Sequence, residues 1–138
     1  MNYMLIAEKL AFKALKKGEV PVGAVIVKKD KIIGKGYNKK EKKRSSLFHA
    51  EIVAINNACK KNKNWRLDDC VLYCTMEPCM MCCGAIIQSR IKKIYYSIKN
   101  DNYGCTELLK NSKIEVIKVD ENLELKNNLL NFFKKKRI

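Results

Sequence analysis

The order in which helical and strand-like patterns alternate constrains the fold of this chain most strongly. Apolar residues recur at helical spacing from Met4 to Leu15, and Gly18 follows as a helix terminator. Beyond that point, short apolar runs typical of strands alternate with helical stripes. Such alternation predicts a layered α/β domain with a partly parallel sheet. The other predicted elements are strands at 22–27, 32–34, 71–76, 91–98 and 114–119, helices at 49–58, 78–88 and 123–136, a hairpin turn at 29–31, and loops at 39–46 and before residue 114.

Length and composition narrow the class of protein. A chain of 138 residues is expected to form one domain, residues 1–138, around one core. The first five residues lack the basic start and apolar core of a signal peptide, and no apolar run approaches the roughly 20 residues that span a bilayer, so we expect no membrane partner. Seven cysteines cannot all pair with one another. We therefore expect a cytoplasmic protein with reduced thiols, which more often serve metal binding or catalysis.

The chain is strongly basic. Its 29 Lys and Arg residues against 14 Asp and Glu residues give a net charge of +15, which suits a polyanion such as nucleic acid. An excess of lysine and asparagine is also what AT-rich coding produces, so the total charge alone does not identify a partner. The positions of the basic runs are more informative, and they lie at 39–44, 60–66 and 134–137.

The residues that carry chemistry lie at two predicted helix starts. His49, the only histidine, precedes Glu51 by two positions, and Cys79 and Cys82 follow Pro78. Cysteines three apart can aim both sulfurs at one point from a single helical turn, and a helix N-terminus favours thiolates. One imidazole and two thiolates suit tetrahedral zinc. Three protein ligands leave the fourth position to water, as in a catalytic site.

Each of these residues alone has a common structural explanation, such as a core histidine, a redox pair or a solvated glutamate. Together they form H-x-E and P-C-x-x-C, the known pattern of zinc deaminases, in which the glutamate moves protons and does not bind metal. No H-E-x-x-H of a metalloprotease is present. Cys83 should point about 100° away from Cys82 around the helix. We interpret the other cysteines mostly as small buried residues: Cys59, Cys70, Cys74 and Cys105.

With these motifs, the chain resembles the bacterial tRNA-specific adenosine deaminases of the cytidine deaminase-like superfamily. The similarity extends from the first helix to the last. It rests on the zinc motifs at 49–52 and 75–82, on the segments 19–25, 36–38 and 84–91, and on the closing aromatic and basic residues 132–137. The resemblance implies a three-layer α/β/α fold with a five-stranded mixed sheet flanked by helices. It also implies a homodimer with one zinc ion per subunit.

The resemblance implies hydrolysis of adenosine to inosine at the wobble position of a tRNA anticodon. Zinc on His49, Cys79 and Cys82 would hold the hydroxide that attacks C6, while Glu51 passes protons to N1 and to the leaving amine. Asn38 could instead be a turn residue at the end of a strand. The two closing phenylalanines could instead be core residues on the apolar face of a helix. The residues implied to contact the substrate are Val20, Pro21, Asn38, Ala50, Pro78, Phe132, Phe133, Lys134, Lys136 and Arg137.

The chain departs from the family pattern after the predicted strand 91–98. The family usually has an aspartate there, followed by a turn of small residues. Here Asn100 and Asp101 follow the strand, and Glu107 stands where a small residue is expected. If Asn100 takes the aspartate position, a carboxylate that contacts the substrate backbone becomes an amide, which could relax the choice between RNA and DNA. An offset of one residue puts Asp101 in that position instead.

Two other functions remain open from the sequence. A deaminase of a free base, nucleoside or nucleotide, of the guanine, cytosine or deoxycytidylate type, would share the zinc motifs but would need no basic patches, and its activity would be indifferent to salt. A nucleic-acid-binding module with a structural zinc would share the charge. The presence of Glu51 and the open fourth ligand position count against that module.

Overall fold

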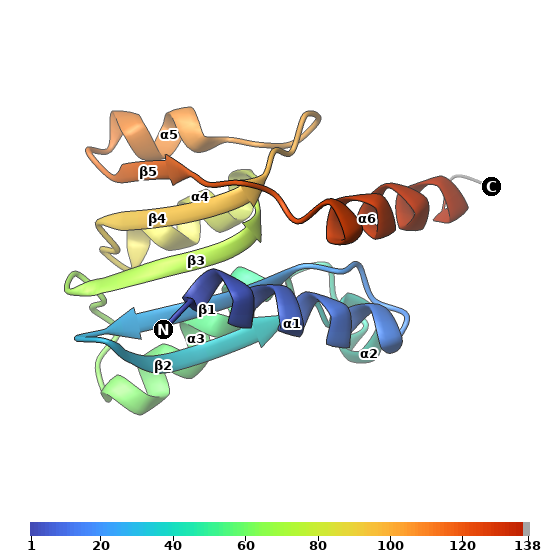
Figure 1. Ribbon diagram of the computed structural model, residues 1–138. Helices are drawn as coiled ribbons and strands as arrows, with labels where there is room; N and C mark the ends of the chain where they lie inside the picture. Colours follow the sequence, from blue (N-terminus) through green and yellow to red (C-terminus); the bar gives the residue numbers. More distant parts are fainter. Residues whose placement is uncertain (137–138) are drawn as a thin grey trace.

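A mixed sheet of five strands forms the centre of the molecule (Figure 1), a computed structural model that describes residues 1–136. The strand order is β2-β1-β3-β4-β5. β1 pairs antiparallel with β2 and β3, whereas β3, β4 and β5 are parallel. The prediction of a partly parallel sheet is confirmed. The strands are β1 (Gly23–Lys28), β2 (Lys31–Tyr37), β3 (Cys70–Met76), β4 (Lys93–Ile98) and β5 (Glu115–Lys118).

Helices cover both faces of this sheet, as the predicted α/β/α layers require. α1 and α6 lie on one face, and α3 and α4 lie on the other (Figure 1). α5 contacts α4 and β5, and α2 lies in the connection from β2 to α3. Among the described residues, no helix is both long and apolar enough to cross a membrane. The helices are α1 (Tyr3–Lys16), α2 (Lys40–Lys43), α3 (Ala50–Asn62), α4 (Met80–Gln88), α5 (Thr106–Asn111) and α6 (Leu123–Lys136).

The predicted loops at 39–46 and before residue 114 contain two short helices, which is a correction to the sequence prediction. α2 has four residues and α5 has six, so neither is long enough to develop a clear helical stripe. Tertiary hydrogen bonds hold both. The Glu19 carboxylate accepts from the backbone of α2, and the Thr106 hydroxyl of α5 donates to Glu77 Oε2 at 2.7 Å.

Other boundaries follow from local backbone chemistry. Lys29 and Asp30 both have positive φ, 48° and 62°, which makes the predicted hairpin turn a tight one. The helix predicted from Pro78 begins two residues later, because Cys79 has extended backbone and is the N-cap of α4. His49 is likewise the N-cap of α3, and Lys63 in the left-handed region ends that helix. The two metal-ligand motifs therefore open two helices.

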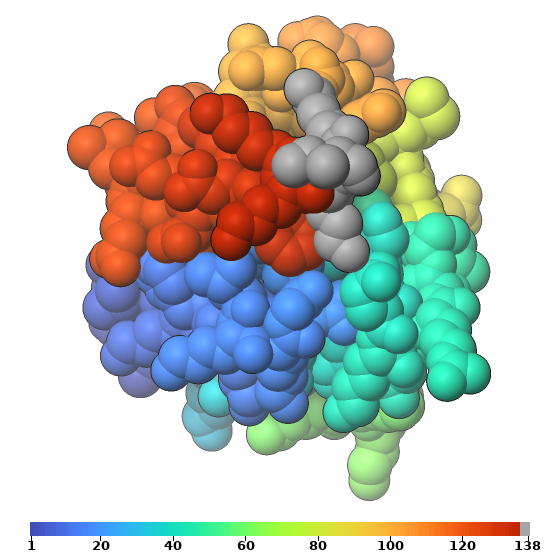
Figure 2. Space-filling view, turned by 90° about the vertical axis from the view of Figure 1, so that its right-hand side faces the viewer, coloured from blue at the N-terminus to red at the C-terminus, as the bar shows by residue number. Residues whose placement is uncertain are grey.

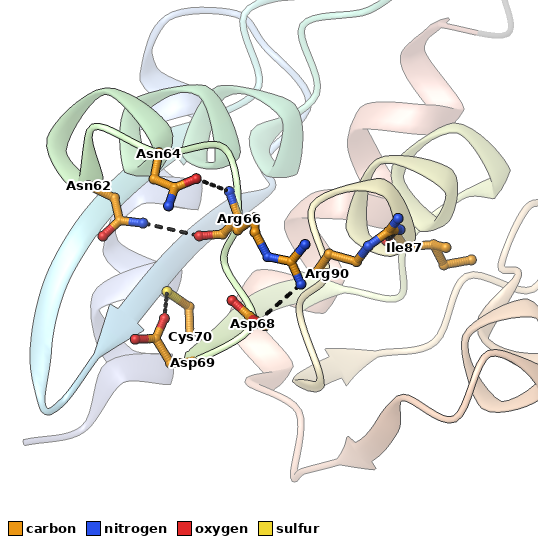
Figure 3. A network of polar contacts seen from close by, with 8 residues as sticks. All are labelled: Asn62, Asn64, Arg66, Asp68, Asp69, Cys70, Ile87 and Arg90. Atoms are coloured by element: carbon orange, nitrogen blue, oxygen red, sulfur yellow. Dashed lines mark hydrogen bonds and ion pairs between the residues drawn. The ribbon is translucent and has the colours of Figure 1, made fainter.

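A polar network holds the loop that leaves the C-terminal end of α3, and Arg90, after α4, lies near it (Figure 3). Asn62 Nδ2 donates to the Arg66 carbonyl oxygen at 3.1 Å, and Asn64 Oδ1 accepts from the Arg66 N–H at 3.0 Å. The guanidinium groups of Arg66 and Arg90 lie 5.4 and 5.9 Å from the ring centre of Trp65. The Trp65 ring, which both guanidinium groups approach, thus lies between the loop that leaves α3 and the end of α4.

Glycines in β2 allow α3 to approach the sheet closely. A Cβ atom at Gly36 would overlap the carbonyl oxygen of Ala50, and one at Gly34 would overlap that of Ala54. We expect Gly36→Ala to lower the free energy of unfolding by about 1–3 kcal/mol, since α3 must move away to make room. Urea denaturation measures this change. Gly84→Ala is the matched control because nothing lies within 4 Å of its Cβ position, and within a helix it should stabilise by about 0.5–1 kcal/mol.

Candidate functional site

The segments that leave β2, β3 and β4 meet at one edge of the sheet. The three strands run in the same direction, so their carboxyl ends lie together on the right of Figure 1. Ligand sites of open α/β sheets are found at this edge. The segment after β2 leads to His49, the segment after β3 leads to Cys79, and the segment after β4 holds Asn100. The fold thus brings residues far apart in the sequence to one place.

His49, Cys79 and Cys82 form one group of potential metal ligands. Their ligand atoms all lie within 4.8 Å of one another. His49 Nδ1 is 3.6 Å from Cys79 Sγ and 3.5 Å from Cys82 Sγ. All three belong to helix N-terminal turns, where the helix dipoles favour anionic ligands. The three residues that the sequence motif picked out therefore lie together and could hold a metal ion.

The pKa of the Cys79 thiol is lowered, as in cysteines that bind metal ions. Hydrogen bonds with Cys82 and His49 stabilise its thiolate and lower its pKa to about 3, against the effect of burial. The pKa of Cys82 is raised, because it donates to Cys79 and is buried. The hydrogen bond with Cys79 raises the pKa of His49, and the charge of Lys40 opposes this rise. A lowered pKa at Cys79 favours the thiolate, the form in which cysteine binds a metal ion.

Glu51 lies in the first turn of α3 beside these ligands. Its side chain is only 4% exposed. Burial raises the pKa of its carboxyl group, while a backbone hydrogen bond and the nearby His49 act in the opposite direction. A carboxyl group with a raised pKa can both accept and return a proton near neutral pH. The geometry therefore places an acid–base group next to the potential metal ligands.

A pocket of about 220 Å³ lies between the segment that follows α1, the start of α2 and the last turns of α6. The metal-ligand residues are not among those that line it, but the N–H of Lys39, between the lining residues Asn38 and Lys40, donates at 2.9 Å to the carbonyl oxygen of Phe48, the residue before His49. Figure 2 looks onto this face, where the end of α1 in blue, the region of α2 in blue-green and α6 in red lie side by side. The lining residues are Glu19, Val20, Asn38, Lys40, Glu41, Phe132 and Phe133.

Four of these lining residues are ones that the resemblance had assigned to substrate: Val20, Asn38, Phe132 and Phe133. Asn38 is 4% exposed, and its side chain makes no hydrogen bond within residues 1–136. Three other assigned residues, Pro21, Ala50 and Pro78, are fully buried and are not among the residues that line the pocket.

The assigned C-terminal residues occupy the last turns of α6. The rings of Phe132 and Phe133 meet edge-on with their centres 6.3 Å apart, and Lys134 is exposed. Lys136 is the last residue of α6, and Arg137 lies outside the described residues. The aromatic part of the tail thus reaches the pocket, and its exposed lysine lies beside it.

Comparison with known proteins identifies the family of this chain. The family model described as MafB19-like deaminase matches residues 1–137. A protein of Buchnera aphidicola subsp. Schizaphis graminum named tRNA-specific adenosine deaminase is 42% identical, over 98% of this chain and 94% of its own length. A protein of the same name from Rickettsia bellii is 48% identical, over 73% of this chain and 71% of its own length. The chain belongs to the tRNA-specific adenosine deaminase family.

Solved structures of a tRNA deaminase and of other deaminases share the fold of this chain. A structure from studies of A-to-I editing by tRNA:A34 deaminases has a TM-score of 0.80 and 32% identity, covering 85% of this chain and 96% of its own. A guanine deaminase from Bacillus subtilis has a TM-score of 0.70 and 31% identity, covering 99% of this chain and 94% of its own. The three-layer deaminase fold predicted from the sequence is confirmed.

In this member of the tRNA-specific adenosine deaminase family, the segment that departs from the family pattern is held by a buried carboxylate. Glu77 Oε1 accepts from the backbone N–H of Asn100 at 3.1 Å. The side-chain oxygen of Asn100 accepts from the N–H of Tyr103, also at 3.1 Å, so this amide shapes the turn. Asp101 is exposed. Sequence reasoning missed Glu77, since a glutamate beside a metal motif gives no sign that it is buried.

Glu19 is a second buried carboxylate that sequence reasoning missed. It is 2% exposed, lines the pocket, and accepts from the N–H groups of Glu41 at 3.0 Å and Lys42 at 2.9 Å. We expect Glu19→Gln to lower the free energy of unfolding by about 1–3 kcal/mol, because a charged acceptor of two bonds is lost. Urea denaturation tests this. Glu115→Gln, at an exposed ion pair, is the control and should change stability by less than about 1 kcal/mol. An equal loss of stability in both variants would contradict the stabilising role of the Glu19 carboxylate.

The other cysteines stay outside the metal-ligand group. Cys83 donates to the carbonyl oxygens of Pro78 and Cys105, as expected if it points away from Cys82. Burial raises the pKa of both Cys83 and Cys70 to about 12. Cys70 and Cys74 are buried as predicted, whereas Cys59 and Cys105 are partly exposed. These thiols are packing groups in the described structure.

Proposed function

We propose that this chain hydrolyses adenosine to inosine at the wobble position of a tRNA anticodon. It would act on the amidine C–N bond of the base. The observation that carries the proposal is the buried Glu51 carboxyl group beside His49, Cys79 and Cys82. Identity of 42% to a tRNA-specific adenosine deaminase along nearly the whole chain supports the substrate class.

Zinc fits the three ligands. In a tetrahedral site with Zn–N and Zn–S bonds of ordinary length, a nitrogen and a sulfur ligand lie about 3.6 Å apart. The distances from His49 Nδ1 to the two sulfurs are 3.6 and 3.5 Å. One nitrogen and two sulfur donors are also a set that zinc prefers to magnesium or calcium. We infer one zinc ion per chain on His49, Cys79 and Cys82, with one position open.

The protein's own residues account for the proton transfers. When bound, zinc supplies a Lewis acid that makes water nucleophilic at neutral pH. Glu51 accepts the proton of the attacking water on its carboxylate and delivers it to N1 of the adenine ring. It then takes the second proton of that water from the oxygen now bonded to C6 and passes it to the amine, which leaves as ammonia when the C6–N bond breaks. Burial of Glu51 excludes bulk water from this carboxyl group and raises its pKa.

Residues of the pocket would hold the RNA around the target base. The side-chain amide of Asn38 is available to hydrogen-bond the target nucleotide, and Val20 offers an apolar contact. Phe132 and Phe133 offer aromatic surface on which a loop base can stack. Lys134, together with Lys136 and Arg137, would contact phosphates. Pro21, Ala50 and Pro78 would form the rigid wall behind the base.

We also propose the domain organisation, the oligomeric state and the cellular location that the sequence predicts. Residues 1–138 would form a single zinc-dependent deaminase domain. Two copies of the chain would form a homodimer, which sedimentation equilibrium measures directly. A tRNA substrate would place the protein in the cytoplasm. Its free cysteines also favour this location, because thiols stay reduced there.

A guanine deaminase is the second candidate function, because one from Bacillus subtilis shares the fold at 31% identity. A free base would use the same metal group and Glu51. It would make no use of the net charge of +15 or of the aromatic and basic end of α6. These features favour RNA.

The deciding experiment gives zinc-loaded protein an anticodon stem-loop RNA with adenosine at the wobble position. Free adenosine, cytidine, deoxycytidylate and guanine are tested in parallel, and mass spectrometry measures conversion of the base. Inosine in the stem-loop alone supports the proposal. Turnover of a free base with unchanged RNA would overturn the substrate, and no turnover by zinc-loaded protein would overturn the enzymatic function and favour a binding module.

A further inference from the structure

Three lysines surround the ring of Tyr37, at the end of β2. The ammonium nitrogens of Lys13, Lys17 and Lys39 lie 5.5, 5.6 and 4.9 Å from the ring centre. Two of them come from the last turn and C-cap of α1, and the third is the N-cap of α2. Residues 13 and 39 are far apart in the sequence, so the fold itself concentrates this charge. We call Lys13, Lys17, Lys39 and Tyr37 the lysine cluster.

The positive charge of the lysine cluster is not neutralised by acidic side chains. The ion pairs found within residues 1–136 include none of its three lysines. The end of a helix attracts cations, which accounts for Lys13 and Lys17. It does not account for Lys39, which lies at the start of another helix. Burial raises the pKa of the Tyr37 phenol, but the hydrogen bond from Lys17 and the charges of Lys39 and Lys13 outweigh it and lower the pKa, as expected in a positive potential.

The lysine cluster is continuous with the proposed base pocket. Tyr37 and Lys39 flank Asn38, and the next residue, Lys40, lines the pocket. Figure 2 shows the end of α1 in blue next to the region of α2 in blue-green on the same face. A strand whose target base enters the pocket must continue across neighbouring surface, and here that surface carries three close, unpaired cations. Mobile ammonium groups bind phosphate as point charges.

We propose that the lysine cluster binds phosphodiester groups of the RNA strand next to the target nucleotide. This proposal rests on the proposed function and adds the direction in which the strand leaves the pocket, over Tyr37 toward the end of α1. The aromatic ring holds the three ammonium groups together through its negative face. Phosphate oxygens then bridge charges that otherwise repel one another.

The test compares two double variants with the same change in net charge. Lys13→Gln with Lys17→Gln removes two lysines of the cluster and leaves Asn38 and its neighbours intact. Lys31→Gln with Lys92→Gln removes two exposed lysines at the opposite edge of the sheet, the first residue of β2 and the residue before β4. The dissociation constant for the anticodon stem-loop RNA is measured by fluorescence anisotropy from 50 to 300 mM KCl. Inosine formation under saturating RNA is measured for all proteins.

We expect the cluster variant to reduce the slope of log affinity against log salt by about 1.4–1.8, because two phosphate contacts are lost. Its rate at saturating RNA should equal that of the wild type, and the control variant should keep the wild-type slope. Equal changes in both variants would show a general effect of charge and overturn the proposal, as would an unchanged slope in the cluster variant. Failure of the proposed function is a separate result, in which the wild type binds RNA or a free base but forms no inosine in RNA.

Discussion

Glu51→Gln is expected to reduce inosine formation by about 10²–10⁴-fold, the usual contribution of a positioned acid–base group. Glutamine has nearly the same shape but cannot accept the proton of the attacking water or return one to the leaving amine. Glu51 is 4% exposed, so no solvent water can readily take its place. The rate is measured on the anticodon stem-loop under single-turnover conditions, which separates chemistry from binding.

Two controls make this result specific. Zinc content and the dissociation constant for RNA should remain those of the wild type, since Glu51 is not one of the metal-ligand group. Glu8→Gln changes another buried glutamate, 9% exposed on α1, and should leave the rate unchanged. Full activity of Glu51→Gln would remove the proposed acid–base role. Equal loss in both variants would indicate damage to folding.

Cys82→Ala is expected to remove bound zinc and, with it, deamination. The change takes away one of three protein ligands, and the remaining two give a much weaker site. The zinc that stays with the protein after gel filtration is measured by elemental mass spectrometry. It should fall from about one ion per chain to a small fraction of that. Inosine formation should fall in proportion to the zinc that is retained.

The neighbouring residue provides a matched control. Cys83→Ala also replaces a buried thiol in the first turns of α4, but Cys83 Sγ bonds backbone carbonyl oxygens and lies outside the metal-ligand group. This variant should keep its zinc and its activity, with a loss of stability of about 1 kcal/mol. Zinc loss in Cys83→Ala with retention in Cys82→Ala would mean that the ligand set has been assigned wrongly.

Most of the sheet was predictable because its strands have distinct apolar runs separated by turn residues. The positions of β1 to β5 follow from local patterns, and the parallel pairing of β3 with β4 follows from the helix that joins them. α2 and α5 were not predictable from periodicity. Each is stabilised by a carboxylate distant in sequence, Glu19 for α2 and Glu77 for α5, and hydrogen bonds between distant residues leave no periodic signal.

The motif residues of the candidate site could be predicted from the sequence, whereas its pocket could not. His49, Glu51, Cys79 and Cys82 have fixed spacing at helix starts, so local geometry alone brings each pair together. The pocket could not be derived in this way, because its wall combines three segments whose contact depends on the whole fold. Resemblance to the family supplied Val20 and Asn38. Neither spacing nor resemblance indicated Glu19, whose burial arises only from tertiary structure.

The metal-ligand group also has a consequence for folding. His49 and Cys79 are 30 positions apart, on helices that pack against different parts of the sheet. A cation held by both is a cross-link, which closes a loop of the chain and removes conformational entropy from the unfolded state, much as a disulfide does. Binding free energy then becomes folding free energy. With zinc bound as proposed, the thermal stability of the protein is expected to rise with the zinc concentration around it.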